Sequence, residues 1–117
     1  FNIGYPNVYD RAHGRTGDFI MVHGNCVSEG CFAMTDRYIE EIYRLSEAAL
    51  LGGQPFFRIH IFPFRMDEVN MARHAGAHWA EFWGMLKPGY DYFERSKSPP
   101  DVILRDKAYV LSDRNRL

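Results

Sequence analysis

The chain has 117 residues, of which 46% are hydrophobic and 25% are charged, a composition typical of one globular domain that can bury a core. Its 14 Lys and Arg are balanced by 15 Asp and Glu, so the net charge of −1 excludes the basic surface that binding of DNA or RNA requires. The apolar runs are only a few residues long, which excludes a bilayer-spanning segment, and two cysteines are too few for a disulfide scaffold.

The first half of the chain predicts an irregular segment, a strand and a helix. Turn-forming residues dominate positions 1–18, so we expect no regular structure there. The apolar run Phe19–Val22 predicts a short buried strand that ends at His23. A helix is expected over Thr35–Leu51, because apolar residues recur there every 3 to 4 positions, Thr35 suits the N-cap and Asp36 complements the helix dipole.

The second half predicts strands around a second helix. Apolar residues alternate over Phe56–Phe62, which indicates a strand. Helical periodicity over Asp67–Leu86 predicts a helix with Gly76 as a weak point, ended by Lys87–Gly89. Val102–Leu111 is typical of a closing strand or strand pair. These elements predict an α+β fold with two main helices, organised as a single domain over residues 1–117.

The stretch Met21–Met34, "MVHGNCVSEGCFAM", has the residues that a nucleophilic thiol needs. Such a thiol requires a base that favours the thiolate, a tight turn that exposes the sulfur, and N–H donors for the oxyanion. Gly30 lets the backbone turn directly before Cys31, and a helix begins a few residues later. His23 is the candidate base, and Gly24 allows the chain to turn back toward Cys31.

The same residues allow other interpretations. His23 and the cysteines could be small buried groups, and Cys26 and Cys31 could form a disulfide across four residues. A zinc site could use His13 and His23 with both cysteines, but C-x4-C without a second close pair is a weak signal. We expect His74 and His78, four residues apart on one predicted helix face, to be a surface or stacking pair and not metal ligands. No metal or cofactor is therefore predicted.

The segment "VHGNCVSEGCFAM" resembles the active-site segment of the L,D-transpeptidase (YkuD) catalytic domain. That signature runs from "HG" at a strand end to "S-x-G-C-(aliphatic)-R-(Met/Leu)". The resemblance is closer to the YafK-like branch, with "IGYPN.YDRAHGRTG", "MVHGNCVS.GCFAMTD", "PFRM" and "FW..LK.GYD.FE" in this order, from Asn2 to about Tyr109. The family fold implies that the chain is part of a mixed β-sandwich, with further strands expected before Phe1, so that it corresponds to an N-terminally truncated catalytic domain.

The resemblance implies roles for individual residues. Cys31 would be the nucleophile and His23 its base, with the Gly24 carbonyl orienting the imidazole and amides around Gly30 and Cys31 forming the oxyanion hole. The family acts on peptidoglycan stem peptides in the periplasm or cell envelope. Its thiolate attacks the diaminopimelate carbonyl to form a thioester, which an amine or water resolves.

One departure from the signature affects substrate binding. The arginine expected two positions after the nucleophile is Ala33 here, so the substrate carboxylate would be bound by Arg65, Arg15 or Arg11. Ser28 is expected to support the Gly30 turn beside the substrate. This difference and a short loop between base and nucleophile match the YafK-like branch, which resembles an amidase that releases a wall-linked lipoprotein. Two alternative functions remain open: a noncatalytic cell-wall-binding fragment that uses the aromatic residues of 79–93, and a small zinc-stabilised module.

Overall fold

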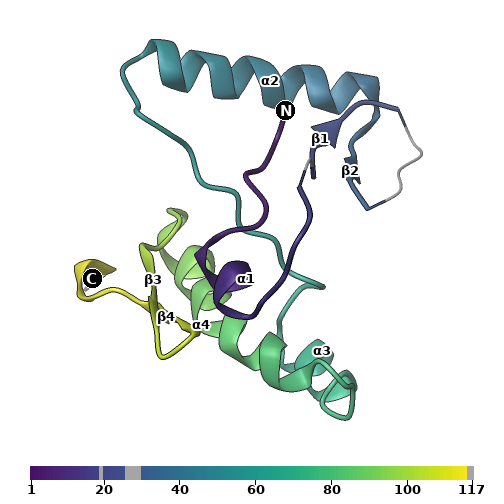
Figure 1. Ribbon diagram of the computed structural model, residues 1–117, viewed down its shortest axis with the longest axis vertical. Helices are drawn as coiled ribbons and strands as arrows, with labels where there is room; N and C mark the ends of the chain where they lie inside the picture. The colour runs from purple at the N-terminus through teal and green to yellow at the C-terminus, as the bar shows by residue number, and fades with distance from the viewer. Residues whose placement is uncertain (19, 26–29, 116–117) are drawn as a thin grey trace. The chain divides into compact units, whose positions relative to one another are not determined.

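The computed structural model describes residues 1–18, 20–25 and 30–115 (Figure 1). They form two compact units, the N-terminal unit Phe1–Ile59 and the C-terminal unit His60–Leu117. Helices and small sheets together make an α+β structure, as predicted; the β-sandwich and the single-domain organisation remain predictions. The elements in chain order are α1 Val8–Ala12, β1 Val22–His23, β2 Phe32–Ala33, α2 Thr35–Leu51, α3 Glu68–Arg73, α4 Ala80–Ser96, β3 Val102–Arg105, β4 Ala108–Leu111 and the 3-10 helix η1 Asp113–Asn115.

β1 lies at the centre of the N-terminal unit. It pairs in parallel with β2, with Val22 opposite Phe32 and His23 opposite Ala33. On its other side the first residues of the chain run antiparallel, and the Val22 N–H donates to the Phe1 carbonyl at 2.8 Å. This pairing explains why the predicted strand Phe19–Val22 is displaced: the ladder includes His23 and starts later, while Phe19 lies outside the described residues.

The helix α1 was not predicted from the sequence. Asn7 caps it by accepting a hydrogen bond from the Asp10 N–H at 3.0 Å, and the Asp10 carboxylate accepts from the Asn7 N–H at 3.1 Å. This capping box satisfies two backbone donors at once and stabilises a helix of only five residues. Tyr9, which is 7% exposed, anchors the helix in the N-terminal unit.

The helix α2 has the predicted bounds, but its N-cap residue differs from the predicted one. Met34 and not Thr35 occupies the N-cap position, and Thr35 is already the first helical residue, with a φ of +60°. The Met34 N–H still donates to the His23 carbonyl at 2.8 Å, so the backbone passes directly from the parallel ladder into the helix. Figure 1 shows α2 beside β1 and β2, and α2 contacts β1.

The strand predicted over Phe56–Phe62 is not formed. The structure describes every residue of this segment, and none of them lies in a strand. Alternation of apolar residues specifies which side chains share a face, but a strand also needs a neighbour that completes its backbone hydrogen bonds. Phe56, Ile59 and Ile61 are accordingly exposed by 56%, 38% and 47%.

The helix predicted over Asp67–Leu86 consists of two helices. Asp67 caps α3 by accepting from the Asn70 N–H at 2.8 Å, and α3 ends at Arg73. Turns then connect it to α4, which begins at Ala80. Gly76, the predicted weak point, lies in this connection, and the low helix propensity of glycine favours an interruption of the helix there.

The helix α4 continues through Lys87–Gly89, where the sequence predicted its end. Tertiary contacts offset the cost of Pro88: α4 packs against β4, and the Tyr109 N–H points at the Met85 sulfur at 3.2 Å. Lys87 also forms an ion pair with Asp91 one turn further along. The helix ends at Ser96, and Lys97 follows it in a left-handed conformation, a common C-cap geometry.

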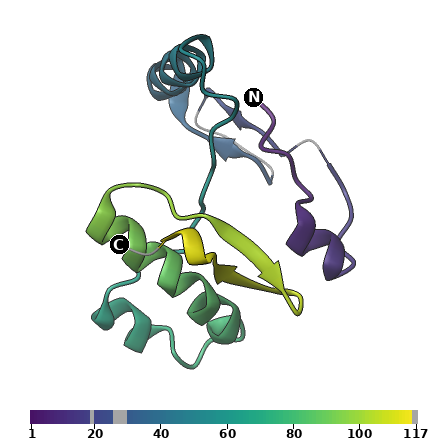
Figure 2. The same cartoon turned by 90° about the vertical axis from the view of Figure 1, so that its left-hand side faces the viewer.

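The predicted closing strand pair is confirmed as the β3–β4 hairpin. Its strands are antiparallel, with Val102 opposite Leu111 and Arg105 opposite Ala108. Asp106 and Lys107 both have a positive φ, as in a type I′ turn, whose twist matches that of paired strands. Figure 2 shows the hairpin alongside α4.

Candidate active site

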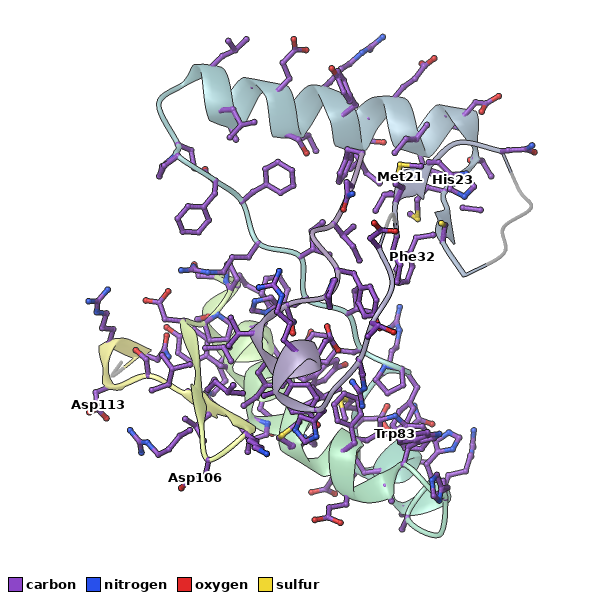
Figure 3. The ribbon with its side chains drawn as sticks, viewed as in Figure 1. Met21, His23, Phe32, Trp83, Asp106 and Asp113 are labelled. Carbon is purple, nitrogen blue, oxygen red and sulfur yellow. The ribbon has the colours of Figure 1, made fainter. Side chains whose placement is uncertain are left out.

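The imidazole of His23 has a defined orientation. Its Nδ1 lies 2.5 Å from the Gly24 carbonyl oxygen. Because a carbonyl oxygen can only accept, Nδ1 must carry the hydrogen of this bond, and in the neutral ring Nε2 is then left unprotonated. An imidazole in this tautomer can accept a proton at Nε2. His23 is half-buried at the end of β1, the position from which a base was predicted (Figure 3).

Cys31 carries a half-buried thiol directly before β2. Gly30 precedes it with a φ of +78°, a left-handed conformation that favours glycine. The ladder pairs His23 with Ala33, and Cys31 stands two residues before Ala33, at the bend that precedes β2. Pairing of β1 with β2 therefore brings the segments that carry His23 and Cys31 side by side.

The backbone around the two residues is held in an uncommon conformation. Asn25, with a φ of +63°, and Thr35, with a φ of +60°, are both left-handed, and the Thr35 N–H donates to the Asn25 carbonyl at 2.7 Å. A positive φ is tolerated by Asn but is a genuine outlier for a β-branched residue such as Thr. Asn25 was not among the predicted site residues. The sequence does contain a signal for its left-handed conformation, because Asn adopts this conformation more readily than most residues and here follows a glycine at the end of a predicted strand.

The candidate substrate-binding residues have different environments. Arg15 forms an ion pair with Asp10 at 3.0 Å and lies over the Tyr9 ring, so its guanidinium is engaged within the N-terminal unit. Arg11 is exposed in the last turn of α1. Arg65 is exposed in the C-terminal unit, and Ser28 lies outside the described residues. Among the three arginines, Arg11 has the exposed side chain in the unit that also contains Cys31.

The described residues contain no group of three or more His, Cys, Asp or Glu side chains that could hold a metal ion. Cys26, a member of the alternative zinc set and of the alternative disulfide, lies outside them. His74 and His78 do not share a helix face as expected, because both follow α3 in the connection to α4. His74 stacks on Phe64 with ring centroids 4.3 Å apart, in line with the predicted stacking role.

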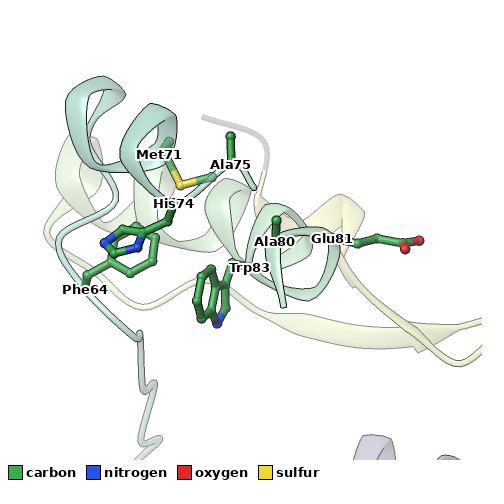
Figure 4. A pocket seen from close by; sticks show the side chains of 7 residues that line it. All are labelled: Phe64, Met71, His74, Ala75, Ala80, Glu81 and Trp83. Atoms are coloured by element: carbon green, nitrogen blue, oxygen red, sulfur yellow. The ribbon is translucent and has the colours of Figure 1, made fainter. Parts of the chain in front are cut away.

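A concave region in the C-terminal unit was not predicted. It is an open pocket of about 340 Å³ (Figure 4) lined by Phe64, Met71, His74, Ala75, Ala80, Glu81 and Trp83. Phe64, His74 and Trp83 already pack on one another, with Phe64 and Trp83 edge to face at 5.3 Å. The pocket is therefore the outer side of a small aromatic cluster, and Glu81 extends away from these rings in Figure 4.

Known proteins are similar in sequence to nearly the whole length of this chain. The chain is 51% identical over 111 residues to "Putative L,D-transpeptidase YafK" of Escherichia coli strain K12, and equally to the protein of the same name from Escherichia coli O157:H7. The chain is similar to the YafK-like L,D-transpeptidases. The match covers 95% of this chain and 45% of each relative, so the chain spans about half the length of these curated proteins. No protein-family model matches it.

The similarity to YafK confirms the resemblance inferred from the sequence motifs. Because 95% of the chain is matched, the similarity includes the His23–Cys31 segment of the N-terminal unit and also α3, α4 and the hairpin of the C-terminal unit. It is therefore not confined to one short motif. Among the described residues, no helix is both long and apolar enough to cross a membrane.

Proposed function

We propose that the chain carries the catalytic segment of a cysteine-dependent peptidoglycan L,D-transpeptidase or amidase that acts at the diaminopimelate carbonyl of stem peptides. The observation that supports this most directly is the His23 imidazole, whose Nδ1 lies 2.5 Å from the Gly24 carbonyl oxygen, at the end of β1, which pairs with the strand directly after Cys31. The similarity to YafK supports the substrate class. The proposal includes the partial mixed β-sandwich that the resemblance to this family implies.

The proposed chemistry has two steps that use a thiol and an imidazole. His23 Nε2 takes the proton of the Cys31 thiol, and the thiolate attacks the diaminopimelate carbonyl carbon, with N–H groups around Gly30 and Cys31 donating to the oxyanion. The carbon–nitrogen bond breaks, and the amine leaves with the proton from His23. In the second step an amine or water gives a proton to His23, attacks the thioester carbonyl and releases the thiolate.

Ala33 is a departure from the family signature. It stands in β2 opposite His23, where the family signature places an arginine, so the substrate carboxylate must be bound by another residue, with Arg11, Arg65 and Arg15 as candidates. This departure matches the YafK-like branch, and we infer an amidase that releases a wall-linked lipoprotein from stem peptides. Such a reaction takes place in the periplasm or cell envelope.

Covalent labelling tests the proposal. The full-length protein that contains this chain is treated with iodoacetamide or with a carbapenem, and its peptides are mapped by mass spectrometry. Cys31 is expected to be labelled, and Cys31→Ala is expected to abolish release of products from purified muropeptides, whereas the matched variant Cys26→Ala retains it. Labelling of Cys26 alone, or turnover that survives Cys31→Ala, contradicts the proposal.

A noncatalytic wall-binding function is the second candidate, and the exposed indole of Trp79 favours it. Trp79 is 53% exposed at the start of α4, and an exposed aromatic face can stack on a sugar ring. This function predicts muropeptide binding that survives Cys31→Ala and is lost in Trp79→Ala, with no turnover by the wild-type protein. Turnover that depends on Cys31 excludes it as the main function.

A further inference from the structure

The carboxylate of Asp36 contacts the turn that follows His23. Asp36 lies in the first turn of α2, and its Oδ1 accepts a hydrogen bond from the Asn25 N–H at 2.9 Å. An acidic residue at this position usually stabilises its own helix through the dipole. Here the carboxylate instead connects the helix to the backbone two residues beyond the candidate base.

Gly24 makes this approach possible. A Cβ atom built on Gly24 would overlap the Asp36 carboxylate and would lie 3.2 Å from a methyl group of Ile39. The φ of Gly24 is not in the left-handed region, so close approach and not backbone conformation explains the glycine. Gly24 and Asp36 therefore fit each other: the glycine has no side chain where the carboxylate lies.

The carboxylate completes a set of three hydrogen bonds that fix the backbone of residues 23–25. The Met34 N–H donates to the His23 carbonyl at 2.8 Å, and the Thr35 N–H donates to the Asn25 carbonyl at 2.7 Å. Asp36 adds the third by accepting from the Asn25 N–H. The Gly24 carbonyl lies between these fixed groups, and it is the acceptor for His23 Nδ1.

We propose that Asp36 is a positioning residue for the candidate base. By accepting from the Asn25 N–H, it holds the Gly24 peptide so that its carbonyl faces His23 Nδ1, which selects the tautomer with an unprotonated Nε2. The inference rests on the proposed function, because an oriented Nε2 matters only if His23 accepts a proton from Cys31. It goes beyond that function by assigning the orientation to a residue of α2.

Three substitutions in the full-length protein separate positioning from helix stability. Asp36→Ala removes the acceptor. Asp36→Glu keeps the negative charge in the first turn of α2, but its longer side chain cannot place an oxygen at the same point against Gly24. Asp36→Asn keeps a side-chain oxygen at that point and can still accept from Asn25. Glu40→Ala, which removes an exposed acid from the next turn, is the matched control.

Two readouts are measured on each variant: the tautomer of neutral His23 from its ring ¹⁵N chemical shifts, and the rate of Cys31 alkylation by iodoacetamide from peptide mapping. In Asp36→Ala and Asp36→Glu we expect His23 to lose its preference for the Nδ1–H tautomer and the alkylation rate to fall about tenfold, the effect of losing one hydrogen bond. Asp36→Asn is expected to stay close to the wild type, as is Glu40→Ala.

The outcomes distinguish this inference from the proposed function. If Asp36→Glu keeps the wild-type tautomer and rate, or if Asp36→Ala lowers stability while both readouts match those of Glu40→Ala, the positioning role is wrong and Asp36 only stabilises α2. If wild-type Cys31 is neither alkylated nor required for turnover, the proposed function is wrong. The tautomer of His23 still tests the contact between Asp36 and the turn in that case.

Discussion

Among the described residues of the C-terminal unit, the non-glycine residues with a positive φ stand where this conformation is usual, at the end of α4 (Lys97) and in the hairpin turn (Asp106–Lys107). Among the described residues of the N-terminal unit they are Asn25 and Thr35, which stand on either side of the candidate nucleophile Cys31, with Asn25 two residues after the candidate base His23. A left-handed β-branched residue costs roughly 1–3 kcal/mol and persists only where its surroundings fix it. The comparison indicates that the backbone conformation around Asn25 and Thr35 lowers the stability of the N-terminal unit.

The deepest burial lies in the C-terminal unit. Met66 and Pro100, the largest fully buried side chains among the described residues, both lie in the C-terminal unit. In the N-terminal unit the buried hydrophobic residues Tyr9 and Val22 are still 7% and 8% exposed, and neither α2 nor, in the C-terminal unit, α4 has a buried residue among its described positions. We therefore expect core substitutions to have their largest effect on stability in the C-terminal unit.

Met66→Ala is the strongest test of this contrast. Met66 is 0% exposed, and truncating a buried Met to Ala leaves a cavity and typically lowers the free energy of unfolding by about 2–5 kcal/mol. Urea unfolding followed through amide resonances of α4 measures the effect. Val69→Ala, at a position that is 68% exposed in the same unit, is the control, and we expect a change of less than about 0.5 kcal/mol. Equal effects of the two variants contradict the assignment of Met66 to the core.

Gly24→Ala and Gly84→Ala sharpen the comparison, because the same change should have opposite signs in the two units. At Gly24 the added methyl overlaps the Asp36 carboxylate, and we expect a loss of about 1–3 kcal/mol in the free energy of unfolding. Gly84 lies inside α4 with no described atom within 4 Å of its built Cβ, so we expect a gain of about 1 kcal/mol from higher helix propensity. Urea unfolding measures both, and a loss at Gly84 contradicts the open space around it.

The elements that the sequence predicted well are those with strong local signals. The bounds of α2 followed from apolar periodicity and the glycines after it, and the β3–β4 hairpin from two apolar runs around a polar turn. The segment Phe56–Phe62 has an equally clear alternation but is not a strand, because pairing depends on a neighbour that the pattern does not specify. Similarly, Pro88 does not end α4, since packing against β4 overrides its low propensity.

Of the candidate site, the sequence predicted the residue types of the base, the nucleophile and the glycines beside them, but not the contacts among them. The motif around His23 and Cys31 indicated a base, a nucleophile and two glycines, and the structure places the His23 ring against the Gly24 carbonyl. The contact between Asp36 and Asn25 was not predictable, because it depends on the positive φ of Asn25 and on the direct passage from β2 into α2. The sequence indicated Asp36 only as a helix-dipole residue.

Thr35→Gly tests the smallest expected effect, the strain in the N-terminal unit. Glycine adopts a φ of +60° without a steric penalty, whereas Thr does not, so the substitution removes strain that exceeds the entropy cost of glycine. We expect the free energy of unfolding, measured by urea unfolding through amide resonances of α2, to rise by roughly 0.5–1 kcal/mol. Thr16→Gly is the matched control, because Thr16 is an exposed residue of the same unit without a positive φ, and it should lower stability by a similar amount. If both variants lose stability equally, Thr35 stores no strain, and the turn around His23 and Cys31 is maintained at no cost to the fold.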